Sequence, residues 1–334
     1  TANLRALLLF TPSQKGGLFS SIFSSTQKGV PTAASLVTPD TDLFAGVMID
    51  WDKFYEGMQT FFATITSAAQ QANAGGPPLA DPFTMAEASF GFSIKNDLLP
   101  TLGNEVAVTL NGVEALYPAA GARKGVKAST PRFTVMIAVK QPARLEKLVG
   151  KILDMPGRIS QPFSQSFHRG ARINYRNGFA YAVTGGFLIL SGSPADIRRA
   201  LDARAAGGGL ASTESFRSVM GQSRPSMMQV YLSSAVTGAI HETMRLEAAK
   251  TSPELATLKT AARAPVGFVI TPDQNNLLVE MRVPTSFAVL ALGSMMQAAP
   301  MTHGIGSSTG GHSTRGNRKT PKLTTDDVKY RRLP

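Results

Sequence analysis

Histidine is the residue type in this sequence best suited to acid–base or metal chemistry, and it occurs as His168, His241, His303 and His312. His241-Glu242 begins like the H-E-x-x-H motif of zinc proteases, in which a second histidine one helical turn on supplies another zinc ligand. Arg245 stands where that histidine is needed. A polar helix face therefore explains His241 and Glu242 better than a metal site does, and no metal site is predicted.

The tail contains a second formal match to a catalytic motif. Gly306–Gly310 fits the G-x-S-x-G pattern, but that pattern works only where a sharp strand-to-helix turn holds the serine above a sheet. A polar, low-complexity context favours a chance match. The absence of cysteine excludes a thiol nucleophile, thiolate metal ligands and a disulfide framework. Because no glycine motif for phosphates or dinucleotides occurs either, the sequence predicts no cofactor and no enzyme activity.

One strand carries residues that could bind nucleic acid. Arg176–Val183 (RNGFAYAV) is similar to the aromatic strand of RNA-recognition domains, whose alternating rings stack on bases. Against this, the rings of Phe179 and Tyr181 share a face with Leu188 and Leu190 in the predicted hairpin, as core residues would, so the burial or exposure of the two rings decides between these interpretations. The candidates for contact with an anion or a nucleic acid are Arg169, Arg172, Arg176, Phe179 and Tyr181.

The stretch Phe179–Asp202 shows most clearly which elements must position these residues. Two short apolar runs flank Gly185-Gly186, which predicts a hairpin with a two-residue turn. Ser193, Pro194 and Asp196 then form the N-terminal signature of a capped helix. The same change from strand through cap to helix recurs at about residues 50, 142, 233 and 285. The sequence therefore predicts an α+β fold, with antiparallel sheets built from hairpins and covered by capped amphipathic helices.

The chain divides by composition into four parts. Residues 1–38 read as an irregular lead-in, and residues 39–225 as an α+β module with a basic central part. Residues 226–300 form either a second α+β module or the completion of the first. They include Phe287–Ala299, which is too short to span a bilayer and predicts a buried helix. Residues 301–334 are polar and basic, and we expect a disordered tail.

Positive charge is concentrated in the centre of the chain and in the tail. The net charge is +12, residues 122–204 carry 15 basic and 4 acidic side chains, and residues 301–334 carry 7 and 2. Basic patches attract nucleic acid, anionic lipid and acidic polymers alike. Binding of a nucleic acid or an anionic surface through 122–204 and the tail is therefore one functional hypothesis, and such binding weakens steeply with salt.

Several strings resemble an uncharacterised bacterial domain-of-unknown-function family of exported or membrane-anchored proteins. They are Leu98–Leu110 (LLPTLGNEVAVTL), Arg132–Val149 (RFTVMIAVKQPARLEKLV), Phe179–Asp202 and Ser215-Phe216, and the resemblance covers roughly residues 40–290. It implies an extracytoplasmic protein that is periplasmic, secreted or anchored through a leader upstream of Thr1. It brings no catalytic residues.

The leading hypothesis is a non-enzymatic envelope or secreted protein that acts as a binding or scaffold module for an unidentified partner. This hypothesis rests on three observations: the sequence shows no recognisable set of catalytic residues, it resembles the family named above, and it contains no cysteine. A hydrolase of unidentified type is a third hypothesis, after the anion-binding one. It requires a pocket in which His168 or His241 lies within hydrogen-bond reach of a serine or a carboxylate.

Overall fold

The computed structural model describes residues 2–9, 25–72, 81–113, 130–153, 162–221, 225–251, 264–273 and 276–285. The fold is α+β, as the sequence predicts. The longer strands are β1 (Ala2–Leu9), β3 (Leu43–Met48), β4 (Leu102–Asn111), β5 (Arg132–Val139), β6 (Ser164–His168), β7 (Ala171–Arg176), β8 (Phe179–Thr184), β9 (Phe187–Ser191), β11 (Met228–Leu232), β12 (Val266–Asp273) and β13 (Asn276–Val283).

Helices connect and cover these strands. They are α2 (Trp51–Ala72), α3 (Pro82–Phe90), α4 (Pro142–Leu153), α5 (Pro194–Ala205), α6 (Glu214–Met220) and α7 (Ser234–Thr251), with short helical turns η2 (Thr32–Leu36), η3 (Ile94–Leu98), η4 (Leu99–Thr101) and η6 (Gly209–Ser212). None of the described helices is both long and apolar enough to cross a bilayer.

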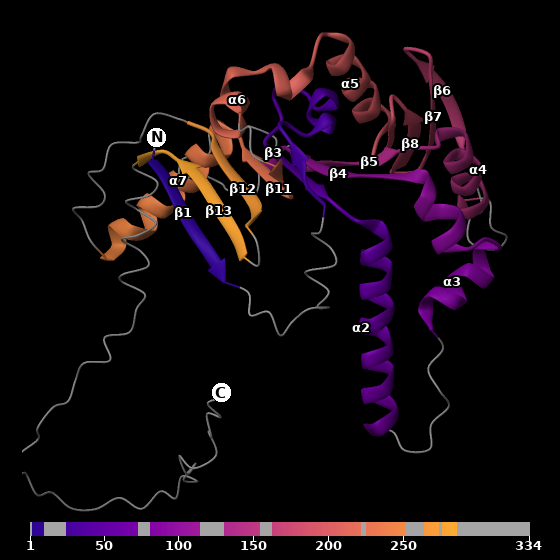
Figure 1. The fold of residues 1–334 in the computed structure, drawn as a ribbon. Helices are drawn as coiled ribbons and strands as arrows, with labels where there is room; N and C mark the ends of the chain where they lie inside the picture. Colours follow the sequence, from indigo (N-terminus) through magenta and orange to yellow (C-terminus); the bar gives the residue numbers. More distant parts are fainter. Residues whose placement is uncertain are drawn as a thin grey trace, which may run out of the picture.

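The longer strands form one sheet in the order β1-β13-β12-β11-β3-β4-β5-β9-β8-β7-β6, and every neighbouring pair is antiparallel (Figure 1). Two further strands, β2 (Gln27–Lys28) and β10 (Pro225–Ser226), pair with each other beside it. Most neighbours in this order are also neighbours in sequence, as expected of hairpin connections. β11 is an exception, because it lies between β12 and the distant strand β3.

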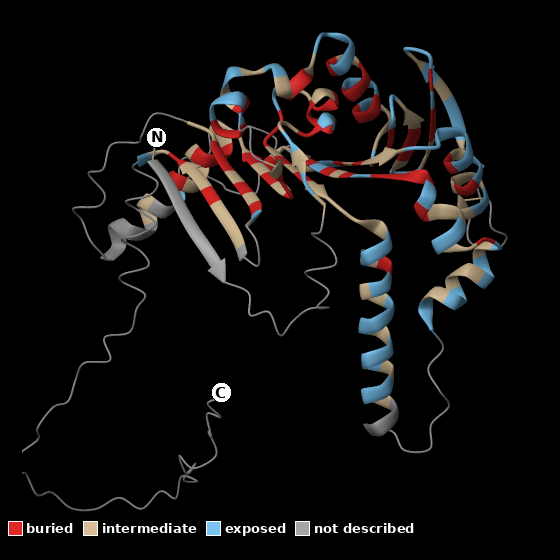
Figure 2. Ribbon diagram, viewed as in Figure 1, coloured by how far each residue is buried: buried red, intermediate tan, exposed pale blue. Residues whose placement is uncertain are grey.

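Side-chain alternation gives the sheet two different faces. The first face is covered by η2, η6, α5 and α6, and its fully buried side chains include Phe44, Met136 and Ile189. The second face is covered over β5, β9 and β8 by α4, η4 and the start of α2, where Leu145 and Leu188 are buried. Figure 2 shows that buried residues concentrate where helices lie on the sheet.

The central hairpin has the geometry that the sequence predicts. Gly185 and Gly186 have φ angles of 59° and 81°, in the left-handed region that a tight turn requires. Val183 lies opposite Leu188, and Tyr181 lies opposite Leu190. Ser193 is the N-cap of the helix that follows, α5, because its Oγ accepts a hydrogen bond from the Ala195 N–H at 3.1 Å.

The prediction of an irregular lead-in is wrong for Ala2–Leu9, which form the edge strand β1. Its partner is β13, with Ala2 opposite Val283. A strand whose partner lies at the other end of the described chain has no local turn signal, so its pattern alone could not identify it. Phe287–Ala299 and residues 301–334 lie outside the described residues.

Glu105 fixes η2 to the sheet. Its buried carboxylate on β4 accepts hydrogen bonds from the backbone N–H groups of Thr32 at 3.1 Å and Ala33 at 2.6 Å. These N–H groups begin a helical turn and have no partner within it. Burial raises the pKa of the Glu105 carboxyl, although the hydrogen bonds from Ala33 and Thr32 oppose the shift.

We therefore expect Glu105 to make the protein less stable as pH rises. The folded state binds the Glu105 proton more tightly than the unfolded chain does. The free energy of unfolding therefore falls as pH rises from the pKa of the unfolded chain, about 4.3, past the higher pKa of the folded state. Glu105→Gln removes this contribution. Urea denaturation between about pH 4 and 8 should give a shallower decline for Glu105→Gln than for the wild type; parallel curves would contradict the assignment.

Candidate functional site

The aromatic residues proposed for nucleic-acid contact are part of the core. Tyr181 is 7% exposed and packs among Leu145 and Leu188 on the second face. Its ring centroid lies 5.6 Å from that of Phe163, and Phe179, which is half-buried, lies 6.2 Å from the same ring. Rings packed in this way do not offer a free face on which a base could stack.

The arginines proposed with them point to different partners. Arg169 forms an ion pair with Asp202 of α5, and Arg172 forms one with Glu146 of α4. The guanidinium of Arg176 lies 4.6 Å from the centroid of Phe163. Arg172 and Arg176 share a face of β7 on the side that α4 covers, whereas Arg169 pairs with a residue of α5 on the other side, so the structure does not bring all three side chains to one surface.

The two histidines among the described residues, His168 and His241, stand on different elements, and neither lines the polar pocket described below. His168 Nε2 lies 2.9 Å from Asp202 Oδ1, but this pair is part of the partly exposed ion pair with Arg169. Hydrogen bonds from Arg169 and His168 hold the pKa of the Asp202 carboxyl below its usual range. His241 is buried on α7, and neither ring nitrogen has a partner among the described residues. Within the described chain, no group of three His, Asp or Glu side chains could hold a metal ion.

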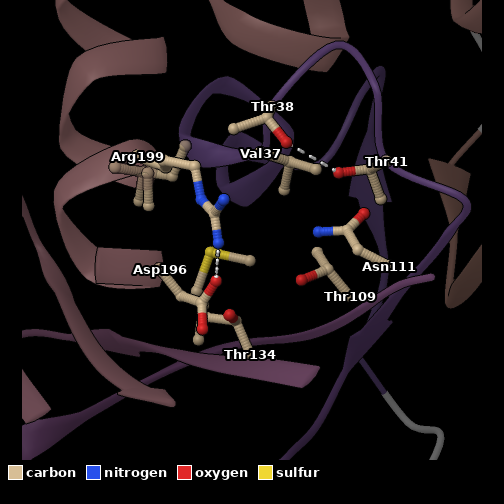
Figure 3. A pocket seen from close by; sticks show the side chains of 11 residues that line it. Val37, Thr38, Thr41, Thr109, Asn111, Thr134, Asp196 and Arg199 are labelled. Carbon is tan, nitrogen blue, oxygen red and sulfur yellow. Dashed lines mark hydrogen bonds and ion pairs between the residues drawn. The ribbon is translucent and has the colours of Figure 1, made fainter. Parts of the chain in front are cut away.

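A polar pocket lies between η2, β4, β5 and α5, on the first face of the sheet (Figure 3). The space in it that the centre of a water molecule can occupy is about 20 Å³, and the pocket opens to solvent on one side. It is lined by Leu36, Val37, Thr38, Thr41, Thr109, Asn111, Thr134, Met136, Asp196, Arg199 and Ala200. The sequence analysis identified Asp196 only as a capping residue and did not identify the others.

Three hydrogen-bond donors from two elements, β4 and α5, face this pocket. Asn111 Oδ1 accepts from the Asp42 backbone N–H at 3.3 Å, which turns the amide nitrogen of Asn111 toward the pocket. Thr109, 4% exposed, directs its hydroxyl into the same space, and it makes no hydrogen bond to any described residue. The Arg199 guanidinium approaches from α5 on the opposite side (Figure 3).

Asp196 connects α5 to β5 and β9 at one side of the pocket through ion pairs and hydrogen bonds. Its carboxylate forms ion pairs with Arg199 and with Arg132, the latter at 3.6 Å. Ser191 Oγ lies 3.2 Å from Asp196 Oδ2 and 3.5 Å from Thr134 Oγ. Two guanidinium groups surround this carboxylate, and the buried carboxylate of Asp42 beside Asn111 accepts hydrogen bonds from the Gly112 and Val113 backbone N–H groups at 2.7 and 3.0 Å. The Arg199 guanidinium is the one cationic group that lines the pocket, and it is a donor suited to an anionic ligand.

The composition of the lining suits binding better than covalent chemistry. The eleven lining residues include no histidine, lysine, serine or glutamate, and their one carboxylate is already paired. An activated nucleophile requires an adjacent base within hydrogen-bond reach. This lining supplies donors and a positive charge but no nucleophile with an adjacent free base.

A weak sequence signal for this pocket exists in β4. Glu105 and Thr109 fall on the strand face that also buries Ala107. Buried polar side chains at alternate positions of a strand require partners. Glu105 finds its partners in η2, whereas the Thr109 hydroxyl faces the pocket.

Comparison with known proteins adds little. No protein-family model and no curated protein matches the chain. Among solved structures, crystal form I of TP0453 has a TM-score of 0.37 and 9% identity, over 79% of this chain and 84% of that chain. Crystal form IV of TP0453 has a TM-score of 0.35 and 6% identity, over 82% and 99%. A likeness at this level supports no inference about function.

The packing of Tyr181 leads to a prediction that separates a core role from a surface role. Tyr181→Ala should lower the free energy of unfolding by about 3 kcal/mol or more, because it removes a large ring from the core. Phe167→Ala is the matched control, since Phe167 is 73% exposed on the neighbouring sheet edge and should change stability by less than about 0.5 kcal/mol. Chemical denaturation measures both. Equal small effects would show that Tyr181 is a surface residue.

Proposed function

We propose that this protein is a non-enzymatic binding protein that holds a small anion, a carboxylate or phosphate group, in the pocket between η2, β4, β5 and α5. The observation that carries the proposal is the convergence of hydrogen-bond donors on one pocket, among them the Thr109 hydroxyl, which faces the pocket and makes no hydrogen bond to any described residue. A hydroxyl that faces a pocket can donate a hydrogen bond to a ligand there, and an oxyanion would accept it.

The neighbouring groups support the same ligand class. The Asn111 amide nitrogen and the Arg199 guanidinium are hydrogen-bond donors that face the space in front of Thr109 (Figure 3). Hydrogen bonds to a charged acceptor are about twice as strong as neutral ones, so three donors suffice to orient a small oxyanion. A location in the cell envelope or outside the cell is part of the proposal, and the family resemblance supports it.

Removing the hydroxyl tests the proposal directly. Thr109→Val keeps the shape and the strand preference of the side chain, and it should weaken the binding of acetate or phosphate by about 10-fold or more. Isothermal titration with acetate, phosphate and neutral glycerol measures this.

Thr271→Val is the matched control. Thr271 is also a buried threonine on a strand of this sheet, but it does not line the pocket. Its variant should bind acetate and phosphate as the wild type does. The proposal fails if the wild type binds neither anion, or if the two valine variants behave alike.

A second variant tests the sign of the ligand charge. Asp196→Asn removes a negative charge beside the pocket and releases Arg199, so the affinity for acetate or phosphate should rise by roughly three- to tenfold. Asp202→Asn changes an acid on the same helix that does not line the pocket, and it should leave the affinity unchanged. Weaker anion binding by Asp196→Asn, with the fold intact by circular dichroism, would argue for a cationic or neutral ligand.

A further inference from the structure

The pocket between η2, β4, β5 and α5 has room for one end of a ligand. The space that a water centre can occupy there is about 20 Å³, and a single water molecule needs about 10 to 15 Å³ of such space. Because the pocket opens to solvent on one side, a ligand can place one small polar group inside while the rest of it lies at the mouth.

The wall that η2 and the next residues form is fixed at both of its ends. At its start, the Glu105 carboxylate accepts hydrogen bonds from the N–H groups of Thr32 and Ala33. At its end, the Leu210 N–H donates a hydrogen bond to the Val37 carbonyl at 2.7 Å. Backbone contacts therefore set the position of this wall and, with it, the width of the pocket.

Gly209 makes the contact at the end of the wall possible. Its φ angle is 52°, in the left-handed region, and a Cβ at this position would collide with the carbonyl oxygens of Ser35 and Val37. Leu36 stands between these two residues, is 1% exposed and lines the pocket. Since η6 already lies against its backbone, the wall cannot move back to admit a larger group.

The charges beside the pocket balance one another. Arg199 lines the pocket, and Arg132 forms an ion pair with Asp196 of the lining. The buried carboxylate of Asp42 lies beside the asparagine of the pocket, and the exposed residue Asp40 precedes it by two positions. Taking a doubly charged group out of water costs more free energy than taking out a singly charged one. Balanced surroundings do not offset this difference.

We propose that the group held in the pocket is a carboxylate at the end of its ligand, in preference to a phosphate. This inference rests on the proposed function and narrows it to one chemical class. A carboxylate carries one charge, and its two oxygens can accept hydrogen bonds from Thr109, Asn111 and Arg199. The apolar part of the lining suits the carbon atom next to the carboxylate; it consists of Leu36, Val37, Met136 and Ala200.

Isothermal titration of the full chain at about pH 8, where phosphate is mostly a dianion, tests the choice of ligand. Acetate should bind at least about 10-fold more tightly than phosphate. Phosphate binding as tight as that of acetate would overturn this inference and leave the proposed function standing, whereas binding of neither anion would remove both. Asp196→Asn should raise the affinity for phosphate by a larger factor than the affinity for acetate, because the dianion interacts twice as strongly with the removed charge. Equal factors would contradict the argument from charge.

Gly209→Ala tests whether the η2 wall sets the pocket. Its Cβ displaces the wall, so acetate affinity should fall by about fivefold or more. Gly207→Ala is the matched control, because Gly207 has a φ angle of 101° and a Cβ there would meet nothing within 4 Å. Both variants strain a left-handed residue and lose stability, and the contact with the wall distinguishes them. Equal acetate affinities in the two variants, both folded by circular dichroism, would overturn the role of the wall.

A carboxylate end occurs on free organic acids and on peptide chains, and a third titration distinguishes these sources. The probes are acetate, a tripeptide of glycine and alanine, and the same tripeptide with an amidated C-terminus. Tighter binding of the free tripeptide than of acetate supports a chain terminus as the ligand, and weaker binding supports a small free acid. An amidated tripeptide that binds as tightly as the free one would show that the carboxylate is not what the pocket recognises, and would overturn the proposal.

Discussion

The alternation of side chains across one continuous sheet is the constraint on which the rest of this structure depends. A shift of one residue in the pairing of β5 with β9 would move every side chain of one strand to the other face. The observed register places Met136 and Ile189 beneath α5, and Ile137 and Leu188 on the face that α4 covers. Thr134 is two residues from Met136 on β5, so its side chain lies on the same covered face of the sheet. The register that builds the core therefore also places Thr134 at the polar pocket.

Local chemistry in the sequence was enough to predict the hairpins and the capped helices. Gly185-Gly186 supplies the two left-handed residues of a tight turn, and Ser193 supplies the oxygen that begins α5. Each of these signals is contained within a few residues. The edge strand β1 could not be recognised in this way, because the groups that pair with it belong to β13.

The candidate site was harder to predict than the fold. Its donors come from β4 and α5 and lie about ninety residues apart in the chain (Thr109 to Arg199), and threonine and asparagine have no spacing that marks a shared pocket. The sequence analysis selected arginines and aromatic rings because they are the residue types that bind nucleic acids. The structure directs those arginines to partners on α5, on α4 and on the ring of Phe163. The two rings fill the core instead, which no inspection of a single strand could establish.

The pairing of β1 with β13 has a consequence for biosynthesis. The ribosome makes Ala2–Leu9 long before the strand beside which they lie, which is completed only at Val283. During translation the backbone groups of these eight residues therefore lack their partner strand until β13 has been made, and such strands are prone to pair with the wrong neighbour. Closing this edge requires the two ends of the described chain to find each other, an encounter of high contact order that delays the final step of folding.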